Sequence, residues 1–411
     1  MLQLTSRDAA FGYRDGLLSG GASTDHIKWG LQDNMPNMMK AMIVGNNQVP
    51  AQLVSIRDMI YASGVGFFKK EIDEKTKKQS LVSYTDSKLE DWSWDVDLQN
   101  HVAAGINQYV ETGNKFSKMV WDVANKWFRP ELSDSFYTRI GNPTNGKIID
   151  YHVNENFGAG RFASASDSDI IKAFDFRNPD VSRKQVTSML HSKERIPGNP
   201  FYAYPTWWCA KEWIELANLI PVFHKSGIQN GYNIKYLIRM PNDYFDAQSG
   251  KALDEKERSR KWSDFSDNLS KWMSGQKNVN KAMFIKYLRG ADGKMMDNVD
   301  VQPLKNEMSD DAYARVWEMA SISIANAMGI LPTLAGVNPG KGNDSGSQIR
   351  VMADYQQHFR TPVPRMIILQ DIQYAIRAMG YKDVFPAFKE VQITTLDTNP
   401  TGAQAVVNQA A

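Results

Sequence analysis

The chain has 411 residues, a formal net charge of +2 and one cysteine, and its apolar and charged fractions are ordinary for a globular protein. A chain of this length can bury a substantial core and divide into more than one domain. The small net charge disfavours a dedicated sequence-specific DNA-binding protein, which usually has a strong basic excess, but it does not exclude a protein past which DNA slides. Cys209 cannot form an intrachain disulfide, so a reducing compartment is expected.

The sequence contains no segment typical of a membrane protein. No apolar run approaches the ~20 residues of a transmembrane helix. The first residues, Met-Leu-Gln-Leu-Thr-Ser-Arg-Asp, lack the basic-then-apolar pattern of a signal peptide. We therefore expect a chain that is made in the cytoplasm and has no membrane partner. Its opening segment is rich in Gly, Ser and Asp and predicts an irregular arm.

The first half of the chain alternates between helical and strand patterns, which indicates an α+β domain. Apolar residues three and four apart predict helices, and short apolar runs bounded by turn residues predict strands. Residues 92–109 mix helical and turn signals, and 115–128 favour a strand or a mixed element. The other predicted elements are helices at 36–44 and 50–61 and strands at 65–69, 81–84, 137–140, 147–151 and 173–176.

Amphipathic helices dominate from Tyr204 onward. A helix is predicted over 204–229, with a kink at Pro221, and a second one over 310–331. Between them, two strand patterns flank a charged amphipathic helix, so a strand–helix–strand module is carried between two helices. The elements of this module are a strand at 236–238, a helix at 251–273 and a strand at 282–288. A last strand is predicted at 391–396.

A glycine-rich loop follows the second long helix. Residues 336–346 read Gly-Val-Asn-Pro-Gly-Lys-Gly-Asn-Asp-Ser-Gly, which cannot form regular structure. A helical pattern then runs over 349–379, and Pro362 and Pro364 predict a kink or break in it. Gly380 is predicted to cap its end. Pattern alone favours an αα-hairpin with a floppy tip.

No motif for catalysis or metal binding is found in the sequence. Gly340-Lys341-Gly342 fails the spacing of a phosphate-binding loop and follows a helix instead of a strand. The six histidines are scattered, and Cys209 lies within a predicted helix. We therefore expect no catalytic residue, no metal and no cofactor. Basic clusters at 75–78 and 258–261 could contact phosphates, although solvated surfaces commonly carry such runs.

The end of the second long helix carries a distinctive sequence. Residues 322–336 read Ile-Ser-Ile-Ala-Asn-Ala-Met-Gly-Ile-Leu-Pro-Thr-Leu-Ala-Gly, and Ser345-Gly346 and Phe-Arg-Thr-Pro-Val-Pro at 359–364 follow in order. This order resembles the portal proteins of tailed bacteriophages, whose signature is a helix, Phe-Gly-Val-Pro-Pro and Leu-Leu-Gly. The segment at 29–36 is similar to the amino-terminal part of some portals. Met-Gly-Ile-Leu-Pro departs from the usual signature, and 110–200 match no part of the family pattern.

The resemblance covers roughly 29–396 and implies an α+β, portal-like fold. Such a fold has a wing α/β domain, a two-helix stem, a small strand–helix–strand clip, and a long kinked helix after a Gly-rich tunnel loop. The implied division is an arm at 1–28, wing at 29–203, stem helix at 204–231, clip at 232–308, second stem helix at 309–331, tunnel loop at 332–348, long wing helix at 349–380, and a wing strand with a small crown or disordered tail at 381–411.

The resemblance also implies a function. Portals form a ring, usually dodecameric, at one capsid vertex of the virion, and double-stranded DNA is packaged and ejected through it. Assembly is expected in the host cytoplasm. Implied partners are further copies of the chain, large terminase, head–tail connector proteins, major capsid and scaffold proteins, and DNA bound without sequence preference. The expected DNA-facing residues are Asn338, Lys341, Asn343, Asp344 and Ser345, and the expected docking residues are Arg258, Arg260 and Lys261.

Two other functions remain open from the sequence. The chain could be another oligomeric virion protein, such as a head-completion or connector protein, although connectors are generally much shorter. It could also be an enzyme that binds phosphate with the loop at 336–346.

Overall fold

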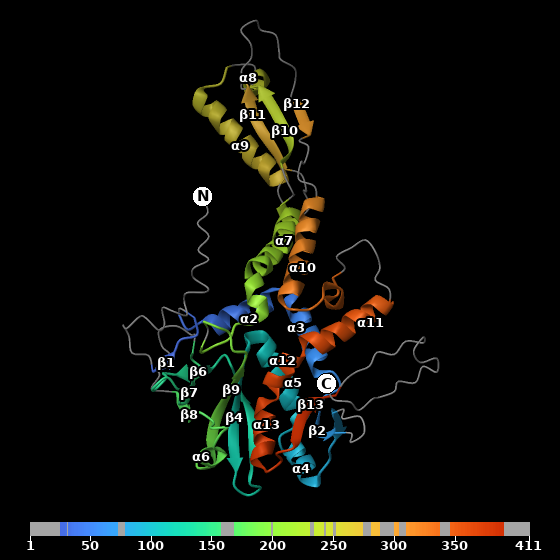
Figure 1. Cartoon of the computed structure of the whole chain (residues 1–411). Helices are drawn as coiled ribbons and strands as arrows, with labels where there is room; N and C mark the ends of the chain where they lie inside the picture. Colours follow the sequence, from blue (N-terminus) through green and yellow to red (C-terminus); the bar gives the residue numbers. More distant parts are fainter. Residues whose placement is uncertain are drawn as a thin grey trace. The chain divides into compact units, whose positions relative to one another are not determined.

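A computed structural model of the chain shows a mixed α+β fold (Figure 1). The chain divides into two compact units: unit 1 consists of 1–214 and 321–411, and unit 2 is the continuous segment 215–320. The structure describes residues 25–30, 32–72, 79–157, 168–198, 200–230, 234–241, 244–249, 252–273, 281–287, 300–303, 310–337 and 346–389.

Unit 1 is built around an antiparallel sheet with the strand order β5-β4-β9. Its strands are β4 (Asn114–Asp122), β5 (Trp127–Ser133) and β9 (Thr187–Lys193). Side chains alternate between the two faces of a strand. Lys115 and Phe116 are neighbours in β4 and are both fully buried, so both faces of the central strand are covered.

Helices cover one face of this sheet and a second sheet covers the other. Lys115 of β4 contacts α5 (Leu98–Thr112) and α13 (Gln370–Ala378), so these two helices share a face. On the other face, Phe116 packs edge-on against Tyr151, with ring centroids 6.1 Å apart. The second sheet has the order β1-β6-β7-β8 and consists of β1 (His26–Ile27), β6 (Thr138–Gly141), β7 (Asp150–Val153) and β8 (Asp169–Lys172).

A third antiparallel sheet has the order β13-β2-β3. Its hairpin, β2 (Val65–Ile72) and β3 (Gln79–Ser83), confirms the strands predicted at 65–69 and 81–84. The third strand is β13 (Val384–Phe388), which the sequence pattern did not predict. The strand predicted at 391–396 lies outside the described residues. In Figure 1, β13 lies beside β2, although the two strands are more than 300 residues apart in the numbering.

The remaining elements of unit 1 are short helices that pack on these sheets. Pro36 and Pro50 lie in the first turns of α2 and α3, where a missing N–H costs nothing, which confirms both predicted helices. These elements are α2 (Met35–Gly45), α3 (Val49–Tyr61), α4 (Ser87–Asp95), α6 (Pro179–Arg183), η2 (Thr206–Ala210), η3 (Pro332–Ala335), α11 (Gly346–Tyr355), the π-helix η4 (Gln356–Arg360) and α12 (Pro362–Ile368).

Several predicted elements of unit 1 need correction. The mixed signals at 92–109 belong to two helices, α4 and α5, separated by a short turn. The strand predicted at 173–176 is wrong, because Asp175 Oδ1 accepts hydrogen bonds from the backbone N–H groups of Arg177 (3.0 Å) and Asn178 (3.1 Å) and closes a turn there. The strand predicted at 147–151 begins only at Asp150.

The long helix predicted at 349–379 is interrupted, as its prolines indicated. It is found as α11, η4, α12 and α13. One break falls at Thr361, beside Pro362, and a second falls at Leu369, where no proline lies, while Pro364 is part of α12. Gly380 caps α13 as predicted: its φ is +104°, and the N–H groups of Gly380 and Tyr381 donate to Arg377 O (3.1 Å) and Ile376 O (3.2 Å).

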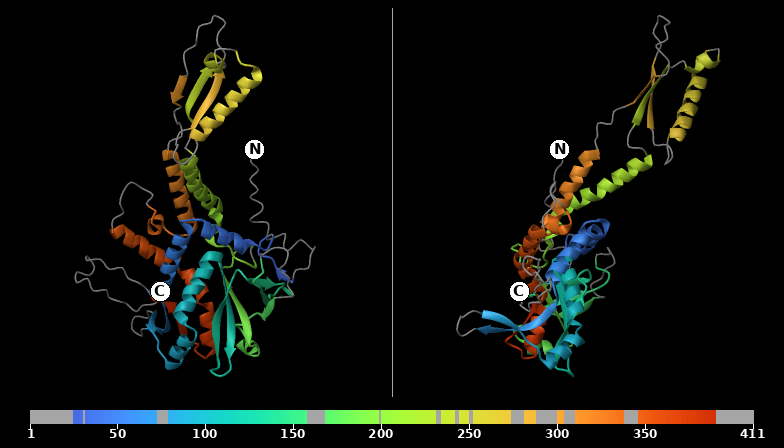
Figure 2. Two further views of the ribbon diagram at one scale, coloured as in Figure 1. Left: turned by 180° about the vertical axis from the view of Figure 1, so that it is seen from behind. Right: turned by 90° about the vertical axis from the view of Figure 1, so that its right-hand side faces the viewer.

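Unit 2 contains a three-stranded sheet with the order β11-β10-β12. Strands β10 (Ile234–Pro241) and β11 (Lys281–Tyr287) are parallel, and β12 (Asp300–Pro303) pairs antiparallel with β10. The crossover between the parallel strands carries α8 (Tyr244–Ser249) and α9 (Glu255–Met273), and α9 lies along one face of the sheet (Figure 2). This confirms the predicted order of strand, helix and strand.

Aromatic contacts hold the parts of unit 2 together. The ring of Phe245 in α8 packs edge-on against Trp262 of α9, with centroids 4.9 Å apart. Two long helices, α7 (Lys211–Asn230) and α10 (Asp310–Ala327), each begin or end in unit 1. Within unit 2, Phe223 of α7 stacks on Tyr313 of α10 at 4.7 Å. Among the described residues, no helix is long and apolar enough to cross a membrane.

A buried ion pair joins three elements of unit 1. The Nζ of Lys115 in β4 donates to Asp371 Oδ2 of α13 at 2.7 Å, and both side chains are 0% exposed. The same oxygen accepts from Ser117 Oγ (2.7 Å) and lies 2.8 Å from His101 Nε2 of α5. Burial would raise the pKa of the Asp371 carboxyl, but the charges and hydrogen bonds of Lys115 and His101 outweigh it and hold that pKa well below its usual range.

Removal of the Lys115 ammonium should destabilise unit 1 strongly. In Lys115→Met, the Asp371 carboxylate stays buried without its cation, which should lower the free energy of unfolding by ~3–5 kcal/mol. The double variant Lys115→Met, Asp371→Leu removes both charges and should recover most of the loss. Urea unfolding followed by circular dichroism measures both, and a single variant as stable as the unmodified chain would contradict the role given to this pair.

Candidate functional site

The elements on both sides of the predicted tunnel loop are tied to each other. Helix α10 ends in a glycine cap, in which Gly329 has a φ of +75° and the Ile330 N–H donates to Ala325 O at 3.2 Å. The side-chain amide of Gln356 in the π-helix then donates to Gly329 O at 2.8 Å. The segment that precedes the loop is therefore bonded to the helix that follows it.

The structure does not describe the predicted DNA-facing residues. Asn338, Lys341, Asn343, Asp344 and Ser345 lie outside the described residues, which stop at Val337 and resume at Gly346. The loop assignment therefore stays a prediction.

The three predicted docking residues lie on α9 and have different surroundings. Arg258 is part of a clamp within unit 2, since its Nη2 lies 2.5 Å from Asp246 Oδ2 and 3.2 Å from Leu253 O. Its hydrogen bond lowers the pKa of Asp246 below the usual range. Arg260 is exposed (84% of its side chain), and Lys261 is also exposed. Arg258 joins α8 to α9, whereas Arg260, 4.0 Å from Asp264 Oδ2, and Lys261 are exposed, and docking by all three stays a prediction.

An apolar stripe runs along the exposed side of α11, η4 and α12. Tyr355 and Phe359 stack on each other with centroids 5.2 Å apart, and Phe359 is 73% exposed. The members recur every three or four residues, as on one face of a helix, and are Val351, Tyr355, Phe359, Val363 and Met366. Exposed apolar side chains gathered in this way are typical of contact surfaces.

The apolar stripe was not predicted as exposed surface. The spacing of apolar residues over 349–379 predicted a helix. That spacing does not show whether the apolar face packs in the core or is exposed on the surface. The sequence Gln-Gln-His-Phe-Arg at 356–360 surrounds Phe359 with polar side chains, and that was the available signal. In the structure, the same five residues form the π-helix η4, and π turns are frequent at functional sites.

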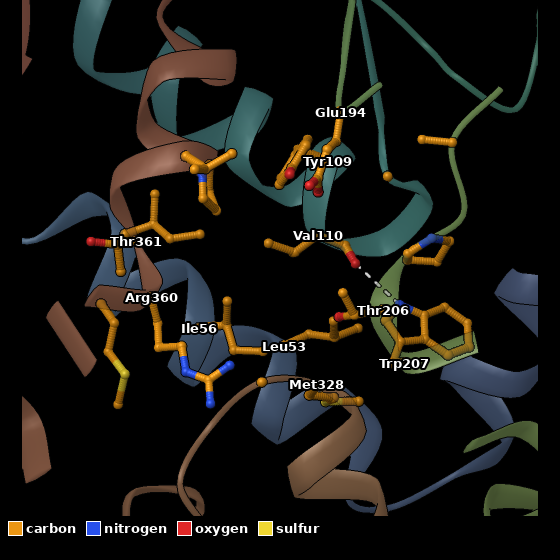
Figure 3. A pocket seen from close by; sticks show the side chains of 18 of the residues that line it. Leu53, Ile56, Tyr109, Val110, Glu194, Thr206, Trp207, Met328, Arg360 and Thr361 are labelled. Atoms are coloured by element: carbon orange, nitrogen blue, oxygen red, sulfur yellow. Dashed lines mark hydrogen bonds between the residues drawn. The ribbon is translucent and has the colours of Figure 1, made fainter. Parts of the chain in front are cut away.

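A cavity of about 270 Å³ lies between α3, α5, η2 and the η4–α12 segment (Figure 3). Leu53, Ile56 and Met328 form much of its apolar lining. Glu194 and Arg360 supply one carboxylate and one cation. The dashed line in Figure 3 is the 3.1 Å hydrogen bond from Trp207 Nε1 to Val110 O, which fixes η2 against the end of α5.

The cavity combines an apolar lining with a buried tyrosine hydroxyl. Burial, and then the Glu194 charge, raise the pKa of Tyr109 to about 12, so its hydroxyl stays protonated at neutral pH. The described residues that line the cavity include no His and no Cys. In the part of the chain that the structure describes, no three His, Cys, Asp or Glu side chains are grouped to hold a metal ion.

Solved structures share the fold of this chain. A chain from the neck of an empty gene transfer agent (GTA) particle, computed with C6 symmetry, has a TM-score of 0.55 and 16% identity, over 95% of this chain and 90% of that one. A chain from the virion of a native GTA particle has a TM-score of 0.54 and 14% identity, over 95% and 91%. A chain from a native GTA neck, computed with C12 symmetry, has a TM-score of 0.54 and 16% identity, over 94% and 91%.

The other comparisons find nothing. No protein-family model matches the chain, and no curated protein matches it. Identities of 14–16% establish likeness of fold and no more. The chain thus has the fold of chains found in the neck and virion of GTA particles.

Proposed function

We propose that this chain is a portal-type virion protein. Identical copies form a ring, most simply of twelve, at one vertex of a capsid, and double-stranded DNA passes through the ring during packaging and ejection. The observation that carries the proposal is the fold likeness to GTA neck and virion chains, which extends over 95% of this chain. The particles in two of those structures were computed with C6 and C12 symmetry, which suits a ring-forming chain.

The order of elements supports the same function. A continuous segment, 215–320, forms a unit of its own between two long helices, α7 and α10. We assign the two helices as the stem and the strand–helix–strand part of unit 2 as the clip, which docks large terminase during packaging and connector proteins afterwards. The wing in unit 1 would then meet capsid and scaffold proteins in the virion.

The charge of the chain suits a DNA conduit. A net charge of +2 gives little general attraction for a polyanion, so DNA is not held tightly. A single lysine, Lys341, in the Gly-rich segment offers a contact to phosphates, which carry no sequence information. This combination permits weak, sequence-independent contact with a moving duplex.

The first prediction of the proposal is a ring. The purified chain should form annular particles with a hole along the axis, visible by negative-stain electron microscopy and with a single mass several times that of the monomer. A compact monomer at every concentration tried, together with a virus that lacks annular particles, would end the proposal.

A second prediction concerns the Gly-rich loop. Deletion of 339–345 should leave ring formation intact but hinder DNA packaging or retention, because the contact with the duplex is lost. Lys341→Ala alone should reduce the amount of packaged DNA only modestly, because one lysine supplies a single phosphate contact to the DNA. Packaged DNA per particle is the measurement, and normal packaging after the deletion would refute the loop assignment.

A third prediction concerns the exposed cations of α9. Arg260→Ala with Lys261→Ala should weaken binding of terminase or connector about tenfold while rings still form. Arg258→Ala is the contrasting variant, because loss of its bonds to Asp246 should lower the stability of unit 2. Binding of partner to purified rings is measured, and unchanged binding of the double variant would remove these residues from the docking surface.

Two alternatives make different predictions. If the chain is a head-completion or connector protein, rings form but loop deletion leaves packaging unchanged. If it is a phosphate-binding enzyme, nucleotide should raise its melting temperature and no rings should form.

A further inference from the structure

The cavity beside the end of α10 contains a buried polar atom without a partner. Gln356, only 4% exposed, lines the cavity, and its Nε2 donates to Gly329 O at 2.8 Å. Because a carbonyl oxygen can only accept, this bond fixes which end of the amide is the nitrogen, and the other end is the acceptor Oε1. Oε1 is buried, and no described residue donates to it. A group that donates a hydrogen bond would remove the cost of this unpaired acceptor.

The rest of the lining suits an aromatic ring. Leu53 and Ile56 of α3, together with Met328, which follows α10, supply apolar surface (Figure 3). The indole of Trp207 adds an aromatic wall, and its own N–H is already bonded to Val110 O. The volume of about 270 Å³ exceeds the ~150 Å³ of an engineered apolar cavity that binds benzene, so a group of two fused rings fits.

The polar groups inside the cavity are neutral. The amide of Gln356 carries no charge, and the Tyr109 hydroxyl, whose pKa burial raises to about 12, stays protonated at neutral pH. The two charged residues that line the cavity, Glu194 and Arg360, are both exposed and therefore mark where it opens to solvent. A charged group placed at Gln356 would lose its hydration without meeting an opposite charge, so a neutral group is favoured there.

We propose that this cavity is a binding site for a small, neutral aromatic group with one N–H donor, such as an indole. The ring packs against Leu53, Ile56 and Trp207, and its N–H donates to Gln356 Oε1. A free indole and a tryptophan side chain both present this chemistry. Gln356 is then bonded on both sides, to the bound group and to Gly329, so that binding steadies the end of α10. The site lies within unit 1 of one copy and does not depend on the proposed function.

Two ligands of nearly the same shape isolate the hydrogen bond. In indene, a CH₂ group replaces the N–H of indole. Isothermal titration calorimetry on the full chain gives the Kd of each ligand, with and without Gln356→Met, which removes the acceptor and keeps the length of the side chain. The ratio of the indene Kd to the indole Kd should fall about tenfold in the variant. The different hydration of the two ligands cancels in this comparison, because both proteins bind from the same solvent.

Filling the cavity tests its location. Ile56→Trp should weaken indole binding about tenfold or more, because the larger side chain takes the space of the ligand. Val54→Trp is the matched control and should bind indole as the unmodified chain does, since Val54 is on the same helix but 43% exposed and outside the lining. Circular dichroism checks the fold of each variant. If Ile56→Trp does not fold, Ile56→Phe takes its place, and if Gln356→Met does not fold, the filling variants decide.

The outcomes decide the site and the source of the bound group. Absence of indole binding up to its solubility limit, or unchanged binding after the cavity is filled, would overturn the site and leave the cavity to water. An unchanged ratio in Gln356→Met would overturn the role of its oxygen. N-acetyl-tryptophanamide is titrated alongside indole. Tighter binding of the amide would assign the group to a tryptophan side chain of a polypeptide, and weaker binding would assign it to a free aromatic molecule.

Discussion

The buried pair of Lys115 and Asp371 is the constraint on which unit 1 depends. It bonds a strand in the first half of the chain to a helix near the end of the described residues, and both side chains are fully buried, so solvent screens their attraction little. Gly105 of α5 makes room for it, because a Cβ there would be only 2.8 Å from Lys115 Cε. The neighbouring elements α5 and β4 are thereby both joined to α13, which follows more than 200 residues later in the chain.

Buried polar groups also fix the segment that begins at Trp29. Arg139, only 1% exposed, bonds the carboxylate of Asp33. Tyr202 stacks on Trp29 and donates to Ile27 O at 2.8 Å, which ties the chain just before η2 to the same segment. Contacts between buried polar groups thus join parts of unit 1 that are far apart in the sequence.

Much of the fold was predictable from the sequence, for identifiable reasons. Prolines at 36, 50 and 362 and glycines at 329 and 380 act through local geometry, so the helix boundaries near them were predicted well. The mixed α+β class and the strand–helix–strand order of unit 2 were predicted from the periodicity of apolar residues alone. Strand β13 was missed because Val-Phe-Pro-Ala-Phe contains a proline, which the ladder tolerates here only because β13 lies at the edge of its sheet.

The candidate site was less predictable. Lys115 and Asp371 are separated by 256 positions, and no local pattern connects them. The exposure of Phe359 depends on which neighbours the fold leaves out, and this too is tertiary information. No local pattern indicated that Arg258 bonds Asp246, which lies on the separate helix α8.

One consequence follows from the position of Gln356. This residue and Phe359 belong to the same π turn, and Gln356 holds the carbonyl at the end of α10. Any displacement of that turn by a bound molecule would therefore displace Gly329, which precedes the glycine-rich segment. The hydrogen bond between the Gln356 amide and the Gly329 carbonyl therefore couples the exposed ring of Phe359 to the chain just before Pro332, and a force on one of them is transmitted to the other.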